Sequence, residues 1–478
     1  MTPAMCGNIA TARLFCPKDV FIISTLSMKP MSFTWPVRPD RMVGGLLHYC
    51  RSLVGGAPRN CVAPSHGPDG TIRHLLVDVS IIARHDARTG IQRVVRAIWT
   101  QLAQAHLHSI EVIPVIGSKR RPYAYAPKDF LESPVDVRKW RGVKVDPHPG
   151  DIFLGLDLSS QIIPRRRRQI AQWKRAGLKF HVVVYDLLPW TDPQWFTRRA
   201  VRNFRKWLDM ISTYADGALC ISDHVRREFS RWLQVSRPGR AGHVAISRLA
   251  MGSEFDVRRG LPEATAMSSG LLKAMAGAPT LLMVGTVEPR KGYDCALAAF
   301  DVLWRRGPQD APNLMIVGKP GWKTASLQQA LLDHPEFGKR LFWARNVSDE
   351  CLERLYGGCA GLLVASRAEG FGLPVLEALA RGCPVLARNL AVFQEQASPG
   401  LSYFDDDDAT ALARSIEAFL NCTSRASSTI SGHPVRPGGV FSGWKEACSD
   451  ILTALDVGPQ TVRNEASVSS GLKMPRGS

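Results

Sequence analysis

The sequence predicts an α/β protein with two doubly wound parallel sheets that face each other across a cleft. Short apolar runs, typical of buried strands, alternate with helical segments along most of the chain. These units form two series, separated by a break at residues 251–270. A chain of 478 residues is long enough for two such domains. We therefore expect two Rossmann-like domains.

The first series begins after residue 72. Its strand-like runs are residues 74–80, 111–116, 151–157, 180–186 and 217–222. An amphipathic segment, residues 91–105, follows the first run and predicts a helix. We expect residues 73–256 to form the N-terminal domain. Residues 1–72 show no sustained periodicity, and we expect a poorly ordered extension there.

The second series predicts a C-terminal domain over residues 257–440. Its strand-like runs are residues 279–286, 313–319, 340–345, 361–366 and 384–387. We expect a closing helix within residues 441–458. The polar segment at 459–478 predicts a mobile tail.

The composition is that of an ordinary soluble protein, with 45% hydrophobic and 22% charged residues. No apolar run approaches the ~20 residues that span a bilayer. The apolar stretch 21–28 is short and lies between Lys18 and Lys29, so we expect no signal peptide. The 11 cysteines include no CxxC pair, which favours a reducing compartment over a disulfide framework or a zinc ribbon.

The positive charge is concentrated in the N-terminal domain. The chain has a net charge of +19, and residues 71–260 hold 33 Lys and Arg against 17 Asp and Glu. The densest runs are residues 164–177 and 197–207. The cations of the second run that fall close to one helical face are Arg198, Arg202, Arg205 and Lys206. Such a stripe could bind anionic lipid headgroups, a phosphorylated acceptor or nucleic acid, and a solvated helix face is the alternative.

Two glutamates stand eight residues apart in EGFGLPVLEAL (369–379). Glu369 follows an apolar strand-like run on a glycine turn, whereas Glu377 lies one turn into a helix. A strand, a glycine turn and a helix N-terminus form the usual ligand-binding edge of an open α/β sheet. Glu369 could therefore accept hydrogen bonds from sugar hydroxyls, and the free N–H groups of the turn could hold phosphate. For Glu377 the alternative is a favourable charge near the positive end of the helix.

A second motif, VGTVEPRKG (284–292), also lies between a strand and a helix. It places Arg290 and Lys291 at the carboxyl end of the strand, near a helix N-terminus. A guanidinium beside an ammonium suits a diphosphate leaving group. Alone, such a pair in a loop is usually just solvated, but on the same sheet edge as Glu369 it becomes stronger evidence for a diphosphate site.

These motifs, together with IVGKPGW (316–322), ASRAEGFGLPVLEALARGCPVLA (365–387) and NLAVFQE (389–395), resemble the donor domain of glycosyltransferase family 4, also called group 1. Its members are retaining sugar transferases with the GT-B fold. The resemblance covers residues 73–420. Residues 78–98 and 183–196 resemble the subgroup that adds mannose or similar sugars to bacterial surface polysaccharides.

The resemblance implies roles for individual residues. Arg290 and Lys291 would neutralise the donor diphosphate as it leaves, and Glu369 would bind the donor sugar. Glu377 would bind the ribose hydroxyls, so that the two acids hold the two ends of one nucleotide sugar. The other residues implied to contact the donor, the base or the phosphates are Gly370, Phe371, Gly372, Gly285, Gly90, Asn346 and Ser348.

The chain departs from the family at Tyr185-Asp186, where many members have His-Asp. This puts any histidine contact to the sugar in doubt. The resemblance still allows Asp186 to orient the acceptor or to line the reaction centre. The alternative is an acid at the end of a strand. No general base is assigned.

We expect no metal and no cofactor other than the nucleotide-sugar substrate. The run FDDDD (404–408) could resemble a metal site, but we expect Asp408 or a neighbour to cap the helix that follows it at 409–420. The twelve histidines form no HxxxH or HExxH pattern, and no P-loop motif is present.

The sequence thus predicts a glycosyltransferase that adds a hexose, with mannose from GDP-mannose as the leading donor. The acceptor would be a growing glycan on a polyprenyl diphosphate. We expect a cytoplasmic protein, peripheral at the inner membrane face through its basic N-terminal domain, and no nucleic-acid partner. The alternatives are a UDP-sugar donor in the same family, or a non-catalytic basic protein of this fold that binds nucleic acid or a partner.

Overall fold

The computed structural model describes Pro64, residues 72–429 and residues 443–457, apart from short gaps at 108, 254, 256–260, 264, 308–310 and 406. These residues belong to one compact unit, residues 57–478. The extension predicted before residue 73 and the tail predicted after 458 lie outside the described residues, except for Pro64 and Ile72.

The first sheet has seven strands in the order β3-β2-β1-β4-β5-β6-β7. Its strands are β1 (Arg73–Asp78), β2 (Ile110–Ile116), β3 (Ala124–Tyr125), β4 (Ile152–Gly155), β5 (Lys179–Val184), β6 (Gly217–Cys220) and β7 (Ala245–Arg248). The prediction of an all-parallel sheet needs a correction, because β3 runs antiparallel to β2 at the edge. An antiparallel edge strand on an otherwise parallel sheet is common in doubly wound folds.

Helices separate most of these strands. They are α2 (Gly90–Gln104), α3 (Arg167–Arg175), α4 (Leu188–Thr191), α5 (Arg198–Tyr214) and α6 (Asp223–Ser236), with 3₁₀ turns η2 (Ile163–Arg166), η3 (Pro193–Trp195) and η4 (Pro238–Arg240). The connections from β1 through α2 to β2 and from β5 through α5 to β6 are crossovers between parallel neighbours.

The second sheet has six strands in the order β10-β9-β8-β11-β12-β13, and every pair is parallel. Its strands are β8 (Thr280–Val284), β9 (Asn313–Val317), β10 (Leu341–Ala344), β11 (Gly361–Val364), β12 (Val385–Arg388) and β13 (Leu401–Phe404). Its helical segments are α7 (Ala266–Met275), η5 (Pro289–Lys291), α8 (Tyr293–Arg306), α9 (Ala325–Leu332), α10 (Asp349–Gly358), α11 (Leu373–Ala380), α12 (Ala391–Gln394) and α13 (Ala409–Thr429). The predicted class, two doubly wound α/β sheets, is confirmed.

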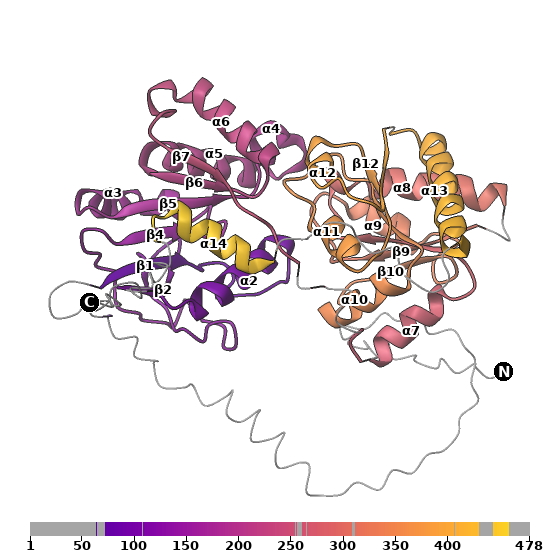
Figure 1. Cartoon of the computed structure of the whole chain (residues 1–478), viewed down its shortest axis with the longest axis horizontal. Helices are drawn as coiled ribbons and strands as arrows, with labels where there is room; N and C mark the ends of the chain where they lie inside the picture. The colour runs from indigo at the N-terminus through magenta and orange to yellow at the C-terminus, as the bar shows by residue number, and fades with distance from the viewer. Residues whose placement is uncertain are drawn as a thin grey trace, which may run out of the picture. The chain divides into compact units, whose positions relative to one another are not determined.

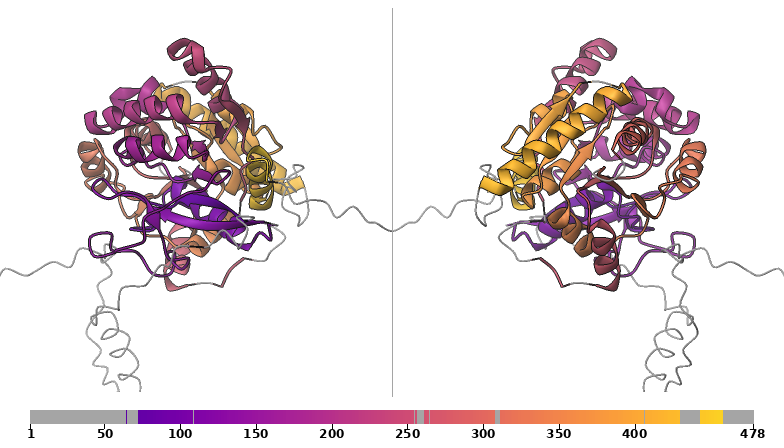
Figure 2. Two further views of the ribbon diagram at one scale, coloured as in Figure 1. Left: turned by 90° about the vertical axis from the view of Figure 1, so that its left-hand side faces the viewer. Right: turned by 90° about the vertical axis from the view of Figure 1, so that its right-hand side faces the viewer.

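Helix α13 covers part of the second sheet, as Figure 2 shows. Its Leu412 and Ile416 are fully buried in the core that this sheet shares with α8. At its start, Asp408 Oδ1 accepts a hydrogen bond from Ala411 N at 2.8 Å. The capping role predicted for Asp408 is therefore confirmed.

The last described helix, α14 (Trp444–Ala454), returns to the first sheet. In Figure 1 it lies, in yellow, among the elements of the N-terminal half. Its Ala447 and Ile451 are fully buried in the same apolar cluster as β1, α2 and β5. Asp450 Oδ2 accepts a hydrogen bond from Ala250 N at 2.7 Å, just after β7. The C-terminal helix therefore completes the core of the N-terminal half.

The loop between β1 and α2 is held at both ends by hydrogen bonds. Asp157, after β4, accepts from Ile81 N at 2.7 Å and from Ile82 N at 2.8 Å. At the other end, Thr89 and Gln92 form a capping box that starts α2. This loop carries Gly90 to the edge of the sheet where β5 ends. None of the described helices is long and apolar enough to cross a membrane.

Candidate active site

The loops that follow β5, β8 and β11 meet the start of α2 at one cavity of about 360 Å³. This volume lies within the range of small-molecule sites. The predicted site residues that line it are Gly90, Asp186, Gly285, Arg290, Lys291, Glu369, Gly370, Phe371 and Gly372. Because the carboxyl ends of parallel strands share one edge, segments far apart in sequence reach one place. We call this cavity the cleft.

Glu369 is held between the two cations of the motif at 284–292. Its Oε2 lies 2.6 Å from Arg290 Nη1, and its Oε1 lies 2.5 Å from Lys291 Nζ. Ser366 Oγ also donates to Oε1, at 2.8 Å. Burial alone would raise the pKa of Glu369, but the two cations lower it to about 2. Glu369 is therefore an ionised acceptor, and Arg290 and Lys291 face the same space.

Glu288 belongs to this cluster, although the sequence analysis did not select it. It is 4% exposed, and its Oε1 lies 2.7 Å from Arg290 Nη2. Burial raises the pKa of Glu288 despite the neighbouring cations. The sequence feature that could have identified Glu288 is its position two residues before Arg290 in the motif VGTVEPRKG. Arg290 is thus oriented by a carboxylate on each side.

Asp186 enters the cleft from the other sheet, at the end of β5. Its Oδ1 accepts a hydrogen bond from Leu188 N at 3.1 Å. Burial raises the pKa of Asp186 to about 6, and Glu369 and Glu288 act in the same direction, whereas Arg290 opposes them. This carboxyl can therefore exchange a proton near neutral pH.

The side chain of the neighbouring Tyr185 forms a hydrogen bond within the first domain. Its hydroxyl donates to the carbonyl oxygen of Leu156 at 2.7 Å, and the residue is only 3% exposed. Where the chain departs from the family's His-Asp pair, the phenol therefore has a buried structural partner.

The glycine turn before α11 brings the backbones of the two sheets together. A Cβ at Gly370 would lie 2.1 Å from the carbonyl oxygen of Tyr185, so no side chain fits there. The carbonyl oxygen of Gly370 accepts from Ser222 Oγ at 2.8 Å. Gly372 has a φ of 90°, a left-handed conformation that glycine adopts readily. The turn therefore needs glycine at 370 because there is no room for a side chain, and at 372 because the backbone is left-handed.

Glu377 lies outside the cleft, beside a separate cavity of about 20 Å³. Its Oε1 is 2.7 Å from Arg93 Nη1 of α2, and its Oε2 accepts from Tyr356 Oη at 3.1 Å. Burial raises the pKa of Glu377, and Arg93 opposes the shift. The sequence analysis did not identify Arg93, which forms an ion pair with the carboxylate that was predicted to bind the ribose.

The loop predicted to touch the base lies outside the cleft as well. Asn346 is exposed, and Ser348 is half-buried. Ser348 caps α10, because its Oγ accepts from Cys351 N at 3.2 Å. Ser348 is thus the N-cap of α10, and its contact with a base stays a prediction.

The arrangement suits a ligand that combines hydroxyl groups with a diphosphate. Glu369 accepts hydrogen bonds, Arg290 and Lys291 supply positive charge, and Asp186 faces them from the other sheet. Among the described residues, no cluster of three or more His, Cys, Asp or Glu side chains is arranged to hold a metal ion.

Comparison with known proteins agrees with this geometry. Residues 272–432 match the family "Glycosyl transferases group 1". The chain is 35% identical over 390 residues to the serotype-specific mannosyltransferase WbdA of Escherichia coli, an alignment that covers 80% of this chain and 45% of WbdA. It is 29% identical over 248 residues to O-antigen chain mannosyltransferase B of Escherichia coli, covering 51% of this chain and 60% of that protein. The chain thus spans less than half the length of WbdA.

Among solved structures, the chain resembles Anabaena Alr3699/HepE in complex with UDP and glucose, with a TM-score of 0.51 and 16% identity. That likeness covers 80% of this chain and 99% of HepE, and it shows that the two proteins share their fold. With its two doubly wound sheets the chain has the GT-B fold, and residues 272–432 are similar to the group 1 glycosyltransferases.

Proposed function

We propose that the protein is a retaining glycosyltransferase that moves a hexose from a nucleotide sugar to a growing glycan. The observation that carries the proposal is the Arg290, Lys291 and Glu369 cluster, which faces Asp186 across one cleft. A departing diphosphate gains from a guanidinium and an ammonium, because charge develops on it in the transition state. Glu369, already ionised, accepts hydrogen bonds from sugar hydroxyls.

The proposed donor is GDP-mannose, and the proposed acceptor is a glycan on a polyprenyl diphosphate. The donor follows from the similarity to two mannosyltransferases of Escherichia coli. The basic N-terminal domain supports a place at an anionic membrane surface on the cytoplasmic side, since each cation near such a surface contributes about 1 kcal/mol. In this proposal no metal or further cofactor takes part, and nucleic acid is not a partner.

The proposed division of labour follows the two sheets. The second domain holds the donor through Arg290, Lys291 and Glu369. The first domain presents the acceptor near Asp186 and closes on the phosphates with the loop at Gly90. Asp186 orients the acceptor hydroxyl, and its pKa of about 6 lets it accept a hydrogen bond from that hydroxyl at neutral pH.

The test is calorimetry of the purified protein with GDP-mannose, GDP, UDP-glucose and UDP, followed by turnover measurements. We expect selective binding of the guanine nucleotides. We also expect Glu369→Gln to lower turnover by about 10² while GDP still binds, since the lost hydrogen bond acts at the sugar. Glu336→Gln, at a half-buried glutamate that pairs with Arg340 at 2.7 Å and does not line the cleft, is the matched control. Selective binding of UDP would show that the donor is a UDP-sugar. If none of the nucleotides binds, the result favours a non-catalytic protein.

A further inference from the structure

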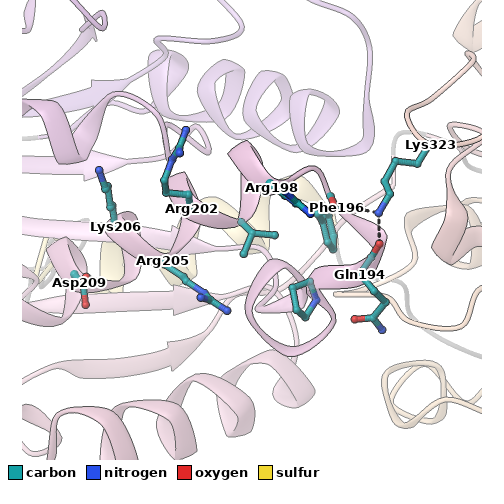
Figure 3. A pocket seen from close by; sticks show the side chains of 10 residues that line it. Gln194, Phe196, Arg198, Arg202, Arg205, Lys206, Asp209 and Lys323 are labelled. Atoms are coloured by element: carbon teal, nitrogen blue, oxygen red, sulfur yellow. Dashed lines mark hydrogen bonds between the residues drawn. The ribbon is translucent and has the colours of Figure 1, made fainter.

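Charged and reactive side chains also gather outside the cleft. The cations predicted as a stripe on α5 line a groove of about 650 Å³, and they are Arg198, Arg202, Arg205 and Lys206. Lys323 reaches this groove from the second domain and donates to the carbonyl oxygen of Gln194 (Figure 3). This charge belongs to the basic domain that already supports the proposed membrane contact. The second domain holds a pair of cysteines that the proposed function does not use.

Cys359 and Cys383 are in contact through their sulfur atoms. The two Sγ atoms lie 3.3 Å apart, within hydrogen-bonding distance for thiols. Both side chains are free thiols, as are the other cysteines in the described part of the chain. Cys383 is 3% exposed, whereas Cys359 is half-buried. The pair therefore combines one enclosed thiol with one that a small molecule can reach.

The pairing of two neighbouring strands explains why these cysteines meet. Cys359 lies two residues before β11, and Cys383 lies two residues before β12. The two strands are parallel, with Leu362 paired to Val385. Neighbouring strands are about 4.8 Å apart, and a disulfide joins Cα atoms that are about 4.4–6.8 Å apart. The backbone spacing at the amino ends of these strands therefore suits a disulfide.

The two cysteines lie at the opposite edge of the sheet from the cleft. The cleft is formed after β11, at Glu369 and the glycine turn, whereas the cysteines precede β11 and β12. Cys359 and Cys383 are 24 positions apart in the sequence. The chain between them contains β11, the glycine turn and α11. A bond between the two sulfurs would thus enclose this whole segment without entering the cleft.

Cys359 is the sulfur that can react first. It is the C-cap residue of α10, and its N–H donates to the carbonyl oxygen of Leu355. The two residues before it, Gly357 and Gly358, are exposed and carry no side chain that could cover the sulfur. The hydrogen bond to Cys359, together with burial, raises the pKa of Cys383. Because the thiolate is the nucleophile, Cys383 is the slower of the two to attack an oxidant.

We propose that Cys359 and Cys383 are a thiol-modification site, where a low-molecular-weight disulfide converts the pair into a reversible disulfide. The proposal does not depend on the proposed function. The bond would fasten the end of α10 to the start of β12. Closing a loop in this way restricts the opened chain, so the segment that carries Glu369 and Glu377 would open less often.

The reaction takes place in two exchange steps. The thiolate of Cys359 attacks one sulfur of the small disulfide, an S–S bond forms to Cys359, and one small thiolate leaves. The thiolate of Cys383 then attacks the Cys359 sulfur, and the second small thiolate leaves. The two protein thiols lose two electrons and two protons, and the small disulfide is reduced to two small thiols.

The test treats the full chain with oxidised glutathione, alkylates the remaining thiols and identifies linked peptides by mass spectrometry. We expect a cross-link between Cys359 and Cys383 that dithiothreitol removes. In Cys383→Ser the cross-link should be lost and Cys359 should keep one glutathione, because the second attacking thiol is gone. Cys422→Ser, at an exposed cysteine of α13, is the matched control and should leave the cross-link unchanged.

Hydrogen exchange measures the consequence for the enclosed segment. We expect the amides of α11 to exchange at least about tenfold more slowly in the oxidised wild type than in the reduced protein. Cys359→Ser, treated in the same way, should show no such slowing.

Three results would overturn the proposal. In the first, wild-type Cys359 keeps glutathione while Cys383 stays a free thiol. In the second, the cross-link joins other cysteines. In the third, α11 exchanges at the same rate in the reduced and oxidised proteins. None of these measurements needs a nucleotide, so failure of the nucleotide titrations would remove the proposed function and leave this result standing.

Discussion

At the scale of single residues, three carboxylates lie with two cations in the cluster at the cleft. Glu288, Glu369 and Asp186 surround Arg290 and Lys291. The two cations keep Glu369 ionised, while burial favours the protonated forms of Asp186 and Glu288. An incoming diphosphate would add negative charge beside all three. The acids that are easiest to protonate would then take up protons.

We therefore predict that binding of a nucleoside diphosphate takes up protons between about pH 6 and pH 7. The pKa of Asp186 is about 6 without ligand, and a nearby anion raises the pKa of an acid. Calorimetry in two buffers of different ionisation enthalpy measures this uptake. In Asp186→Asn the uptake should shrink, because one titrating group is gone. Proton release on binding, or an uptake unchanged in the variant, would contradict the prediction.

The sequence was sufficient to place the residues that follow recognisable strands. Arg290, Lys291 and Glu369 each follow a recognisable strand on one sheet edge, and they lie together as predicted. Glu377 lies in a helix as predicted, but its ion pair with Arg93 was not predictable, since Arg93 is nearly three hundred residues away on the other domain. The short strands β3, β7 and β13 were also missed, because their exposed or very short segments lack an apolar run.

At the scale of elements, α2 links the two domains through Arg93. Besides Glu377, Arg93 contacts Asp349 of α10 at 3.4 Å and lies 5.3 Å from the centroid of the Phe255 ring. Lys319 Nζ, after β9, donates to the carbonyl oxygen of Ala87 at 3.0 Å. The start of α2 is thus attached to the second domain on both sides of Gly90.

We predict that Arg93→Leu tightens binding of the donor nucleotide several-fold. If Glu377 holds the ribose, the nucleotide must first displace Arg93 from this carboxylate, and the variant removes that competition. Calorimetry with GDP measures the Kd. Arg305→Leu, a change at an exposed cation, serves as the control. Weaker binding in Arg93→Leu would show instead that Arg93 itself contacts the nucleotide.

The loop between β1 and α2 should respond to pH through Asp157. Burial raises the pKa of Asp157 to about 7, and the nearby Asp78 acts in the same direction. The folded protein therefore binds more protons at this group than the unfolded chain does between about pH 4 and pH 7. The stability that Asp157 contributes is present below this window and is lost as the pH rises through it.

We predict that the stability of the wild type relative to Asp157→Asn falls as the pH rises from about 4 to about 7. The slope is at most about 1.4 kcal/mol per pH unit for one group. Urea unfolding of both proteins at several pH values measures it, and the comparison cancels other groups such as His181, whose pKa burial lowers to about 4. A stability difference independent of pH would contradict the assignment.

At the scale of the whole molecule, the N-terminal domain is assembled from two distant parts of the chain. Its sheet spans Arg73 to Arg248, and its core also contains the side chains of α14. The backbone of Trp444 lies so near Gly252 that a Cβ there would be 2.5 Å from Trp444 N. The second domain therefore forms an insertion between two pieces of the first domain.

We predict that Trp444→Ala destabilises the protein by about 3 kcal/mol, as expected when a large buried aromatic side chain is truncated. Trp444 is 9% exposed and packs in the core of the first domain. Val235→Ala, at a side chain 79% exposed, should change the free energy of unfolding by less than about 0.5 kcal/mol. Urea unfolding measures both. Equal effects would show that α14 adds nothing to the core.

The return of α14 also sets the order in which the domains can mature on the ribosome. Domains generally fold as units while the chain emerges, the N-terminal one first. Here the first domain lacks Ala447, Ile451 and their neighbours until the second domain has been synthesised. The second domain can therefore reach its native packing before the first, so that folding completes in the reverse of the chain order.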